Sequence, residues 1–351
     1  METLFFLLVS FAVILIGAEL FTNGIEWVGR KLDLAEGAVG SVLAAVGTAL
    51  PETMIPIVAI LGGGADSSHE VGIGAILGAP FMLATLAMFV TGVAVMGAKS
   101  RRKTGTIMDI EPVVVGKDVR FFLLTYGIAI AVAFVPTDLT WVRPAAAVLL
   151  FVLYAIYVRA HFAAEAQTGH GGDLAPLRFH RLDRGAHRKD PVVPRLRAVT
   201  VQVIFALGLI IVGALVFVEA VTDISETLGI RATLLALVIA PIATELPEKL
   251  NSVLWVRQGK DTLAIGNISG AMVFQSCFPV AVALLFAPDG WAIGPESRIA
   301  FLSAGIAIVS TIAIFLPMVR RASLTGRGLL VGGAFYAAYL LIVVVGGVSA
   351  A

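Results

Sequence analysis

The fold of this chain is decided by two six-residue stretches, Gly47-Thr48-Ala49-Leu50-Pro51-Glu52 and Ala243-Thr244-Glu245-Leu246-Pro247-Glu248. Each stretch lies inside a long apolar segment and places threonine, proline and glutamate in the same register. Such residues are scarce at mid-membrane depth, because an ionisable side chain is costly to bury in hydrocarbon. The match therefore indicates an internal repeat rather than a chance similarity between apolar helices.

The composition places both stretches in a membrane. Of the 351 residues, 58% are hydrophobic and 14% are charged, whereas soluble domains carry roughly 25% charged residues. A water-soluble protein needs more polar surface than this, which excludes soluble enzymes, nucleic-acid-binding proteins and secreted disulfide scaffolds. The formal net charge of +1 gives no reason to expect a nucleic-acid partner. The single cysteine, Cys277, excludes an intrachain disulfide.

Ten segments are long and apolar enough to cross a bilayer core of about 30 Å, which takes about 20 residues per helix. They are 4–28, 37–62, 71–97, 120–136, 141–162, 198–222, 232–256, 263–287, 297–319 and 328–348. We therefore predict an all-α integral membrane protein with ten transmembrane helices. Two five-helix repeats, 1–162 and 198–351, are expected on either side of a polar linker at 163–197.

The two repeats are predicted to have opposite orientations. A shift of 196 residues aligns the two motif stretches and also aligns Gly17 with Gly213. The repeats begin five spans apart, and because five is odd, the second repeat enters the membrane from the opposite face. Inverted-topology repeats of this kind are typical of secondary transporters, which use the symmetry to open a central site to either side.

Basic residues predict the orientation. Of the 25 lysine and arginine residues, 21 fall in the connections on one side; Lys249 lies inside a span, and only Arg143, Arg231 and Arg298 fall on the other side. Cytoplasmic loops carry the excess of lysine and arginine. We expect a multi-pass protein of the plasma (inner) membrane, with the 163–197 linker in the cytoplasm and both termini outside.

The repeated stretches supply oxygen ligands at mid-membrane depth. A threonine four residues before each glutamate shares its helix face. Each intervening proline lacks an N–H group and frees the backbone carbonyl four residues earlier. The resulting ligand set is Glu52, Thr48 and the carbonyl of Gly47 in the first half, and Glu248, Thr244 and the carbonyl of Ala243 in the second.

These hard oxygen ligands favour a divalent cation. Two carboxylates meeting across a twofold axis would neutralise Ca²⁺, which accepts six to eight oxygens in flexible geometry, whereas Mg²⁺ dehydrates reluctantly. Soft metals prefer Cys, Met or His, and the two motifs contain none of these. The alternative is that the glutamates are protonated or paired packing residues, which their symmetric recurrence disfavours.

The motifs resemble those of the calcium:cation antiporter superfamily, the sodium/calcium exchanger family. That family carries a G-T-S-x-P-E-like motif on the second helix of each inverted repeat and a G-N-x-x-G-S-N-like motif on the third. The third-helix motif reads Gly266-Asn267-Ile268-Ser269-Gly270-Ala271 in the second half and is degraded to Gly74-Ala75-Ile76-Leu77-Gly78-Ala79-Pro80 in the first. The resemblance covers 37–97 and 232–287 and extends through the helix layout to most of the chain.

The resemblance implies exchange of Ca²⁺, or a related divalent cation, against Na⁺ or H⁺ by alternating access. Both glutamates, both threonines and the nearby carbonyls would form the ion sites, with Asn267, Gln275 and Glu245 as auxiliary ligands. The implied partners are inorganic cations and the lipid bilayer, and neither a resident cofactor nor an enzymatic activity is expected. Glu245 and Ala49 stand where the family carries serine-like ligands. The two halves of the site are therefore expected to differ in their ligands, and both Na⁺ and H⁺ remain candidate counter-ions.

Lys249 follows Glu248 inside a predicted span and has two interpretations. In the first, it tethers one carboxylate as a fixed internal cation and lowers the coupling to Na⁺. In the second, it snorkels or pairs away from the site, which its position about 100° around the helix from Glu248 favours.

Three other functions compete with divalent-cation exchange. The first is a proton-coupled carrier of another cation, and the second is a non-transporting membrane protein that binds ions. The third is an intramembrane hydrolase with paired carboxylates. A hydrolase has no need of an inverted repeat, and we find no hydrolase motif in the sequence.

Overall fold

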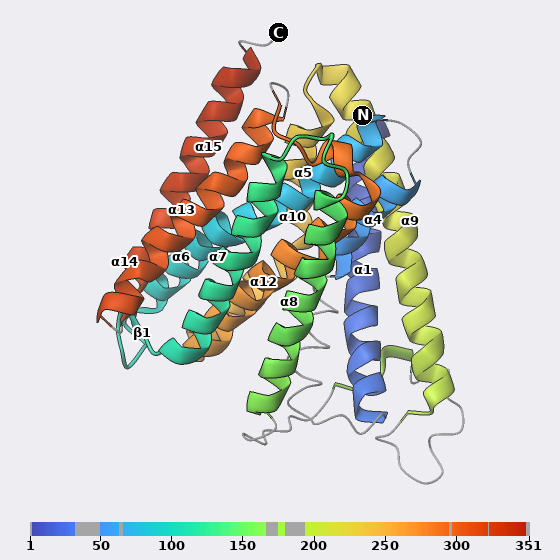
Figure 1. Cartoon of the computed structure of the whole chain (residues 1–351). Coiled ribbons are helices and arrows are strands. Elements are labelled where there is room, and N and C mark those ends of the chain that lie inside the picture. The colour runs from blue at the N-terminus through green and yellow to red at the C-terminus, as the bar shows by residue number, and fades with distance from the viewer. Residues whose placement is uncertain are drawn as a thin grey trace.

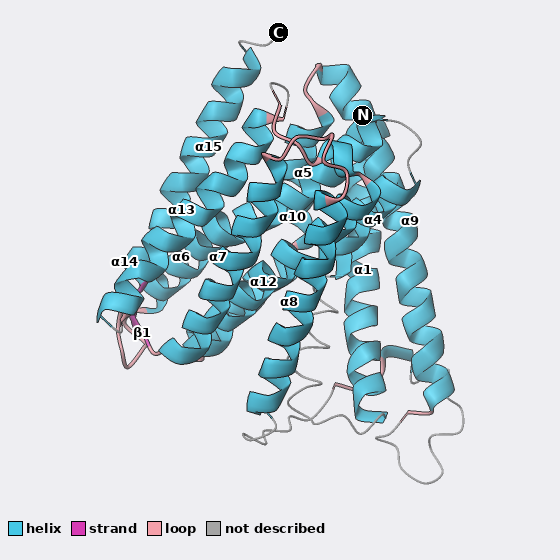
Figure 2. Cartoon of the chain, in the orientation of Figure 1, coloured by secondary structure: helices cyan, strands magenta, loops and turns pink. Residues whose placement is uncertain are grey.

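The protein is almost entirely helical (Figure 2). The computed structural model describes residues 2–31, 50–62, 66–165, 175–179, 194–294, 297–321 and 323–348. The first half contains the helices α1 (Glu2–Lys31), α4 (Leu50–Gly62), α5 (Asp66–Met82), η2 (Leu83–Ala87, a π-helical segment), α6 (Met88–Ala98), α7 (Pro112–Ala133) and α8 (Val142–Glu165). The second half contains α9 (Leu196–Leu228), α10 (Ala232–Thr244), α11 (Leu246–Arg257), α12 (Asp261–Phe286), η5 (Pro288–Gly290, a 3₁₀ turn), α13 (Arg298–Arg321), α14 (Gly326–Leu329) and α15 (Val331–Val348). Two short strands, β1 (Ile107–Met108) and β2 (Leu324–Thr325), pair antiparallel.

The described helices make this a multi-pass membrane protein. Seven of them, within the described part of the chain, are long and apolar enough to cross a bilayer. These segments are Glu2–Val28, Ser68–Ala98, Val142–Ala160, Leu196–Leu228, Asp261–Phe286, Arg298–Val319 and Gly326–Val343. Each overlaps one of the ten predicted spans. The predicted span at 37–62 is described only from residue 50, where α4 begins.

The predicted single span at 232–256 is wrong in detail, because the structure divides it into α10 and α11. The helix breaks at Glu245, whose backbone dihedrals (φ −86°, ψ 6°) lie outside the helical range. Pro247 follows in the first turn of α11. Proline is tolerated in a first helical turn but cannot donate the hydrogen bond that would continue a preceding helix. The second-half motif therefore sits at a junction between two short helices.

Helices α1 and α9 pack antiparallel along one another (Figure 1). A Cβ atom at Gly17 would lie 2.7 Å from Cγ1 of Ile210, and a Cβ atom at Gly213 would lie 2.7 Å from Cγ1 of Ile14. Gly213 and Ile210 occupy the positions that the 196-residue shift aligns with Gly17 and Ile14. Equivalent residues thus contact one another reciprocally, as they do in an interface on a twofold axis.

Helices α5 and α10 approach more closely still. A Cβ atom at Gly74 would lie 2.1 Å from the carbonyl oxygen of Thr233, and one at Gly78 would lie 2.3 Å from that of Leu237. Small residues at four-residue spacing allow such backbone contact between membrane helices. This contact holds the first-half helix α5 against the helix that carries the second-half motif.

A short piece of the predicted linker, residues 175–179, is held between α1 and α9. The indole Nε1 of Trp27 donates to the carbonyl of Ala175 at 3.0 Å. The backbone N–H of Arg178 donates to Oδ1 of Asn23 at 3.0 Å. This part of the linker is therefore bound to the helix pair rather than solvated throughout.

Replacing Gly74 or Gly78 with alanine is expected to destabilise the protein, because the added methyl group would collide with backbone that cannot move aside. Overpacking of this kind costs about 1–3 kcal/mol. Gly266→Ala is the matched control, because a Cβ atom at this helical position has no neighbour within 4 Å. Thermal unfolding of the detergent-solubilised protein measures the difference. Equal melting temperatures for Gly78→Ala and Gly266→Ala would contradict the close contact.

Candidate cation site

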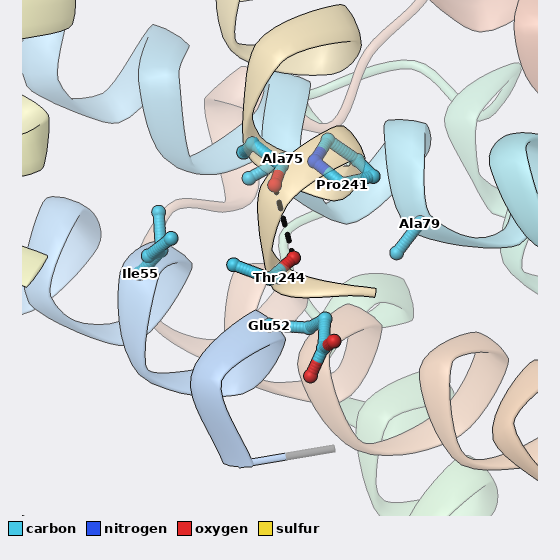
Figure 3. A pocket seen from close by; sticks show the side chains of 7 residues that line it. Glu52, Ile55, Ala75, Ala79, Pro241 and Thr244 are labelled. Atoms are coloured by element: carbon cyan, nitrogen blue, oxygen red, sulfur yellow. Dashed lines mark hydrogen bonds between the residues drawn. The ribbon is translucent and has the colours of Figure 1, made fainter. Parts of the chain in front are cut away.

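The two halves of the chain meet in a small pocket between α4, α5 and α10 (Figure 3). Its lining consists of Glu52 and Ile55 from α4, Ala75 and Ala79 from α5, and Ala240, Pro241 and Thr244 from α10. The pocket is narrow, and a sphere of the size of a water molecule does not fit into it. Residues of both predicted motifs, nearly 200 positions apart in the sequence, therefore share one pocket.

Glu52 contributes the carboxylate of the pocket. Its side chain is only 6% exposed, and it extends beside Thr244 at one end of the pocket (Figure 3). Around it the lining is mostly apolar, with only Thr244 adding a polar side chain. A carboxylate in such a place requires a compensating charge or hydrogen bonds, because an isolated charge is strongly disfavoured away from water.

Thr244 contributes a hydroxyl oxygen from the last residue of α10. Its hydroxyl group donates a hydrogen bond to the carbonyl of Ala240 at 3.0 Å, drawn as the dashed line in Figure 3. A hydroxyl has one proton to donate and two lone pairs to offer. Because the proton is used within the helix, the lone pairs of this oxygen remain suited to a cation.

Glu245 and Lys249 form a buried ion pair beside the pocket. Nζ of Lys249 lies 3.2 Å from Oε2 of Glu245 and donates to the carbonyl of Pro241, also at 3.2 Å. Glu245 is 1% exposed and Lys249 is 6% exposed. Lys249 therefore does not snorkel to the membrane surface. Both interpretations of Lys249 allow it to pair with a carboxylate, and they differ in whether that carboxylate belongs to the cation site.

The structure describes four other predicted ligands only in part or not at all. Glu248 lies in the first turn of α11 and Ala243 in the last turn of α10, and the described part of the structure does not include their side chains. Gly47 and Thr48 lie outside the described residues.

Asn267 and Gln275 lie on α12 and do not line the pocket. Gln275 is 2% exposed. Its Oε1 atom and Nδ2 of Asn267 are buried without a hydrogen-bond partner in the described part of the chain. Buried polar atoms normally have partners. Both amides are therefore polar groups at membrane depth whose hydrogen-bonding capacity is only partly used.

The degraded third-helix motif of the first half supplies an apolar wall of the pocket. Ala75 and Ala79 from that motif line the pocket, where the exchanger pattern would supply polar ligands. Pro241 was missed by sequence analysis, and its signal was a second proline within the predicted span 232–256. The site is thus richer in polar groups on its α10 side than on its α5 side.

Sequence analysis also missed Asp118, a buried carboxylate on α7. Its Oδ1 accepts from the hydroxyl of Tyr157 at 2.9 Å and its Oδ2 from the hydroxyl of Ser269 at 2.7 Å. The predicted span began at residue 120 and left Asp118 in a loop, whereas α7 begins at Pro112. This network ties the Ser269 position of the second-half motif to α7 and α8.

Comparison with known proteins decides the family. The family described as sodium/calcium exchanger protein matches residues 2–162 and 198–346. The chain belongs to the sodium/calcium exchanger protein family. This confirms the resemblance found in the motifs. The matched ranges leave out residues 163–197, the polar linker.

Individual members of the exchanger family are distant in sequence. "Putative antiporter CaxA" of Alkalimonas amylolytica is 25% identical over 324 residues, which cover 91% of this chain and 90% of that protein. "Sodium/calcium exchanger MaX1" of Methanosarcina acetivorans is 31% identical over 85 residues, 24% of each chain. Both relatives carry the names of ion antiporters or exchangers.

Two solved exchangers share the fold. The H⁺/Ca²⁺ exchanger CAX superposes with a TM-score of 0.72 at 16% identity, covering 97% of this chain and 82% of that one. A structure of the sodium-calcium exchanger NCX_Mj superposes with a TM-score of 0.56 at 17% identity, covering 98% of both chains. At these identities the likeness concerns the fold alone.

Filling the pocket is expected to remove cation binding without changing the charge of the protein. Ala79→Val adds two methyl groups to the pocket wall, and we expect Ca²⁺ to raise the melting temperature of the wild type but not that of this variant. A ligand at about 100 times its Kd stabilises the folded state by about 2.7 kcal/mol. Gly97→Ala is the control, because this residue lies on α6 with open space around it. An unchanged Ca²⁺ response in Ala79→Val would place the cation elsewhere.

Proposed function

We propose that this exchanger-family protein is a secondary-active antiporter that moves Ca²⁺, or a related divalent cation, against Na⁺ or H⁺ by alternating access. The observation that carries the proposal is the narrow pocket that both Glu52 of the first half and Thr244 of the second half line. A buried carboxylate beside a hydroxyl oxygen at membrane depth is a set of hard ligands suited to Ca²⁺. Because the chain belongs to the exchanger family, we expect it to exchange ions rather than to act as a channel or an enzyme.

The proposed ligand shell combines both halves of the chain. Glu52 and Glu248 are the central carboxylates, and the cation is cargo rather than a resident cofactor. Oxygen ligands from both repeats allow the coordination number that Ca²⁺ requires. The full proposed set is Glu52, Glu248, Thr48, Thr244, the carbonyls of Gly47 and Ala243, and the auxiliary residues Glu245, Asn267 and Gln275.

We propose a ten-helix architecture of two inverted repeats, 1–162 and 198–351, joined by the 163–197 linker. The reciprocal contact of Gly17 and Gly213 with Ile210 and Ile14 supports a twofold relation between the halves. Two structurally equivalent halves that point in opposite directions can exchange conformations, and the exchange opens the pocket to one side and then to the other. In this mechanism α1 and α9, which open the two repeats, move against the remaining helices.

The proposed orientation places the linker in the cytoplasm and both termini outside the plasma (inner) membrane. The N-terminal end of α1 and the C-terminal end of α15 lie at one end of the molecule, whereas the end of α8 and the start of α9 lie at the other (Figure 1). This arrangement agrees with the 21 basic residues on the linker side.

Replacing either central glutamate with glutamine is expected to abolish exchange while the protein stays folded. Glutamine keeps the size of the side chain and removes the charge that compensates a divalent cation. The measurement is uptake of ⁴⁵Ca²⁺ into proteoliposomes under an imposed Na⁺ gradient or pH gradient, and the two gradients also identify the counter-ion. We expect Glu52→Gln and Glu248→Gln to lower the initial rate by at least about 100-fold, as for loss of an essential charged ligand.

Glu226→Gln serves as the charge-matched control, because Glu226 is exposed near the end of α9. It should transport at the wild-type rate. Normal gradient-driven flux in either central variant would remove that glutamate from the mechanism. Wild-type protein that binds Ca²⁺ but shows no flux under either gradient would instead indicate a non-transporting ion-binding protein.

Cysteine labelling tests the topology. The single native cysteine, Cys277, is buried, so it gives little background with a membrane-impermeant maleimide. Glu2→Cys is expected to react from outside intact cells, whereas Thr168→Cys in the linker should react only after the membrane is permeabilised. The opposite pattern would invert the proposed orientation.

A further inference from the structure

We infer that Lys249 is a built-in cation of the transport site, which neutralises Glu245 and sets the exchange at about two monovalent cations per divalent cation. The inference rests on the proposed antiport function and deepens it. It assigns to the protein itself a positive charge that a third transported ion would otherwise have to supply.

Lys249 is held beside the pocket by two contacts. Its ammonium group is fixed at two points, the Glu245 carboxylate and the Pro241 carbonyl, each at 3.2 Å. Pro241 itself lines the pocket, and so does Thr244, the residue directly before Glu245. The ion pair therefore lies next to the lining of the proposed cation site rather than at the membrane surface.

Glu245 and Lys249 both belong to the helix break between α10 and α11. Glu245 sits at the junction between α10 and α11, and Lys249 lies one turn into α11. Residues four apart on a helix are neighbours on its surface. The lysine is thus held to a carboxylate of its own helix and remains with the site whichever way the pocket opens. A transported ion cannot do this, because it must leave at each turnover.

The number of charged side chains in the two motif regions determines how many cations can neutralise the site. Glu52, Glu248 and Glu245 bring three carboxylates to the two motif regions, and Lys249 subtracts one charge. Net charge is costly in the low-dielectric interior of a membrane. A transport site that opens first to one side and then to the other is therefore favoured when the net charge of its side chains and bound ions is close to zero. With Lys249 in place, one divalent cation or two monovalent cations neutralise the remaining two carboxylates. Without it, three monovalent cations would be needed.

Lys249 could also be only a brace for the helix break. A brace and a built-in cation predict different results, because a brace affects stability and turnover but not the charge moved in each cycle. Lys249→Arg keeps the charge, Lys249→Met removes it, and Lys249→Met combined with Glu245→Gln removes the ion pair as a unit. These three variants separate charge from structure.

The test is the voltage dependence of ⁴⁵Ca²⁺ accumulation in proteoliposomes under the gradient that drives exchange. A K⁺ gradient with valinomycin sets the membrane potential. Wild type, Lys249→Arg and the double variant are expected to reach the same Ca²⁺ ratio at every potential. Lys249→Met is expected to move one net charge per cycle, so that its Ca²⁺ ratio shifts by about 50-fold per roughly 100 mV. A voltage-dependent wild type, or a voltage-independent Lys249→Met, overturns the inference.

A binding measurement keeps the inference testable when a variant does not transport. Glu245→Gln leaves Lys249 positive without its carboxylate, and it should weaken Ca²⁺ binding to the purified protein by roughly tenfold or more through charge repulsion. Adding Lys249→Met to this variant should recover the part of the affinity that was lost to charge repulsion, because only the auxiliary ligand Glu245 is then missing. Equal affinity in all variants overturns the inference, whereas absent gradient-driven flux in wild type, with these affinity differences intact, overturns only the antiport function.

Discussion

The structure depends on one constraint, the cost of leaving charged and polar groups without partners at a depth where water cannot reach them. Lys249 meets it with Glu245 and a backbone carbonyl. Asp118, only 1% exposed, meets it by accepting from the hydroxyls of Tyr157 and Ser269. Hydrocarbon offers no hydrogen bonds, so each such group must find its partner within the protein. The positions of these groups consequently fix how the helices face one another.

The surrounding lipid also determines how the helices contact one another. Lipid competes with side chains for apolar surface, so membrane helices gain specificity from close backbone packing at small residues. Gly17 and Gly213 serve this purpose between α1 and α9, and Gly74 and Gly78 between α5 and α10. The first contact relates the two halves reciprocally, and the second brings the α5 wall against the helix that ends in Thr244. The close contact between α5 and α10 thus brings together two of the three helices that line the pocket.

The chemistry of the pocket follows from its asymmetry. The α5 side contributes the methyl groups of Ala75 and Ala79, whereas the α10 side contributes Thr244 and continues into the Glu245–Lys249 pair. An exchanger needs ligands that release a divalent cation as well as bind it. A site that combines few neutral ligands with an internal positive charge binds the cation less tightly than a fully acidic site would. In the proposed mechanism, that moderation allows turnover.

Much of this protein was determined by its sequence alone. Apolar length identified a multi-pass membrane protein, and the register of threonine, proline and glutamate in two stretches identified the exchanger family, because both properties are local to the chain. The sequence could not show that α10 and α11 separate at Glu245, that α7 extends to include Asp118, or that Lys249 pairs with Glu245. It also could not show that Ala75 and Ala79 line the pocket beside Glu52 and Thr244. Those facts were decided only by tertiary structure, because distances between side chains from different helices depend on how closely the helices pack and where each one ends.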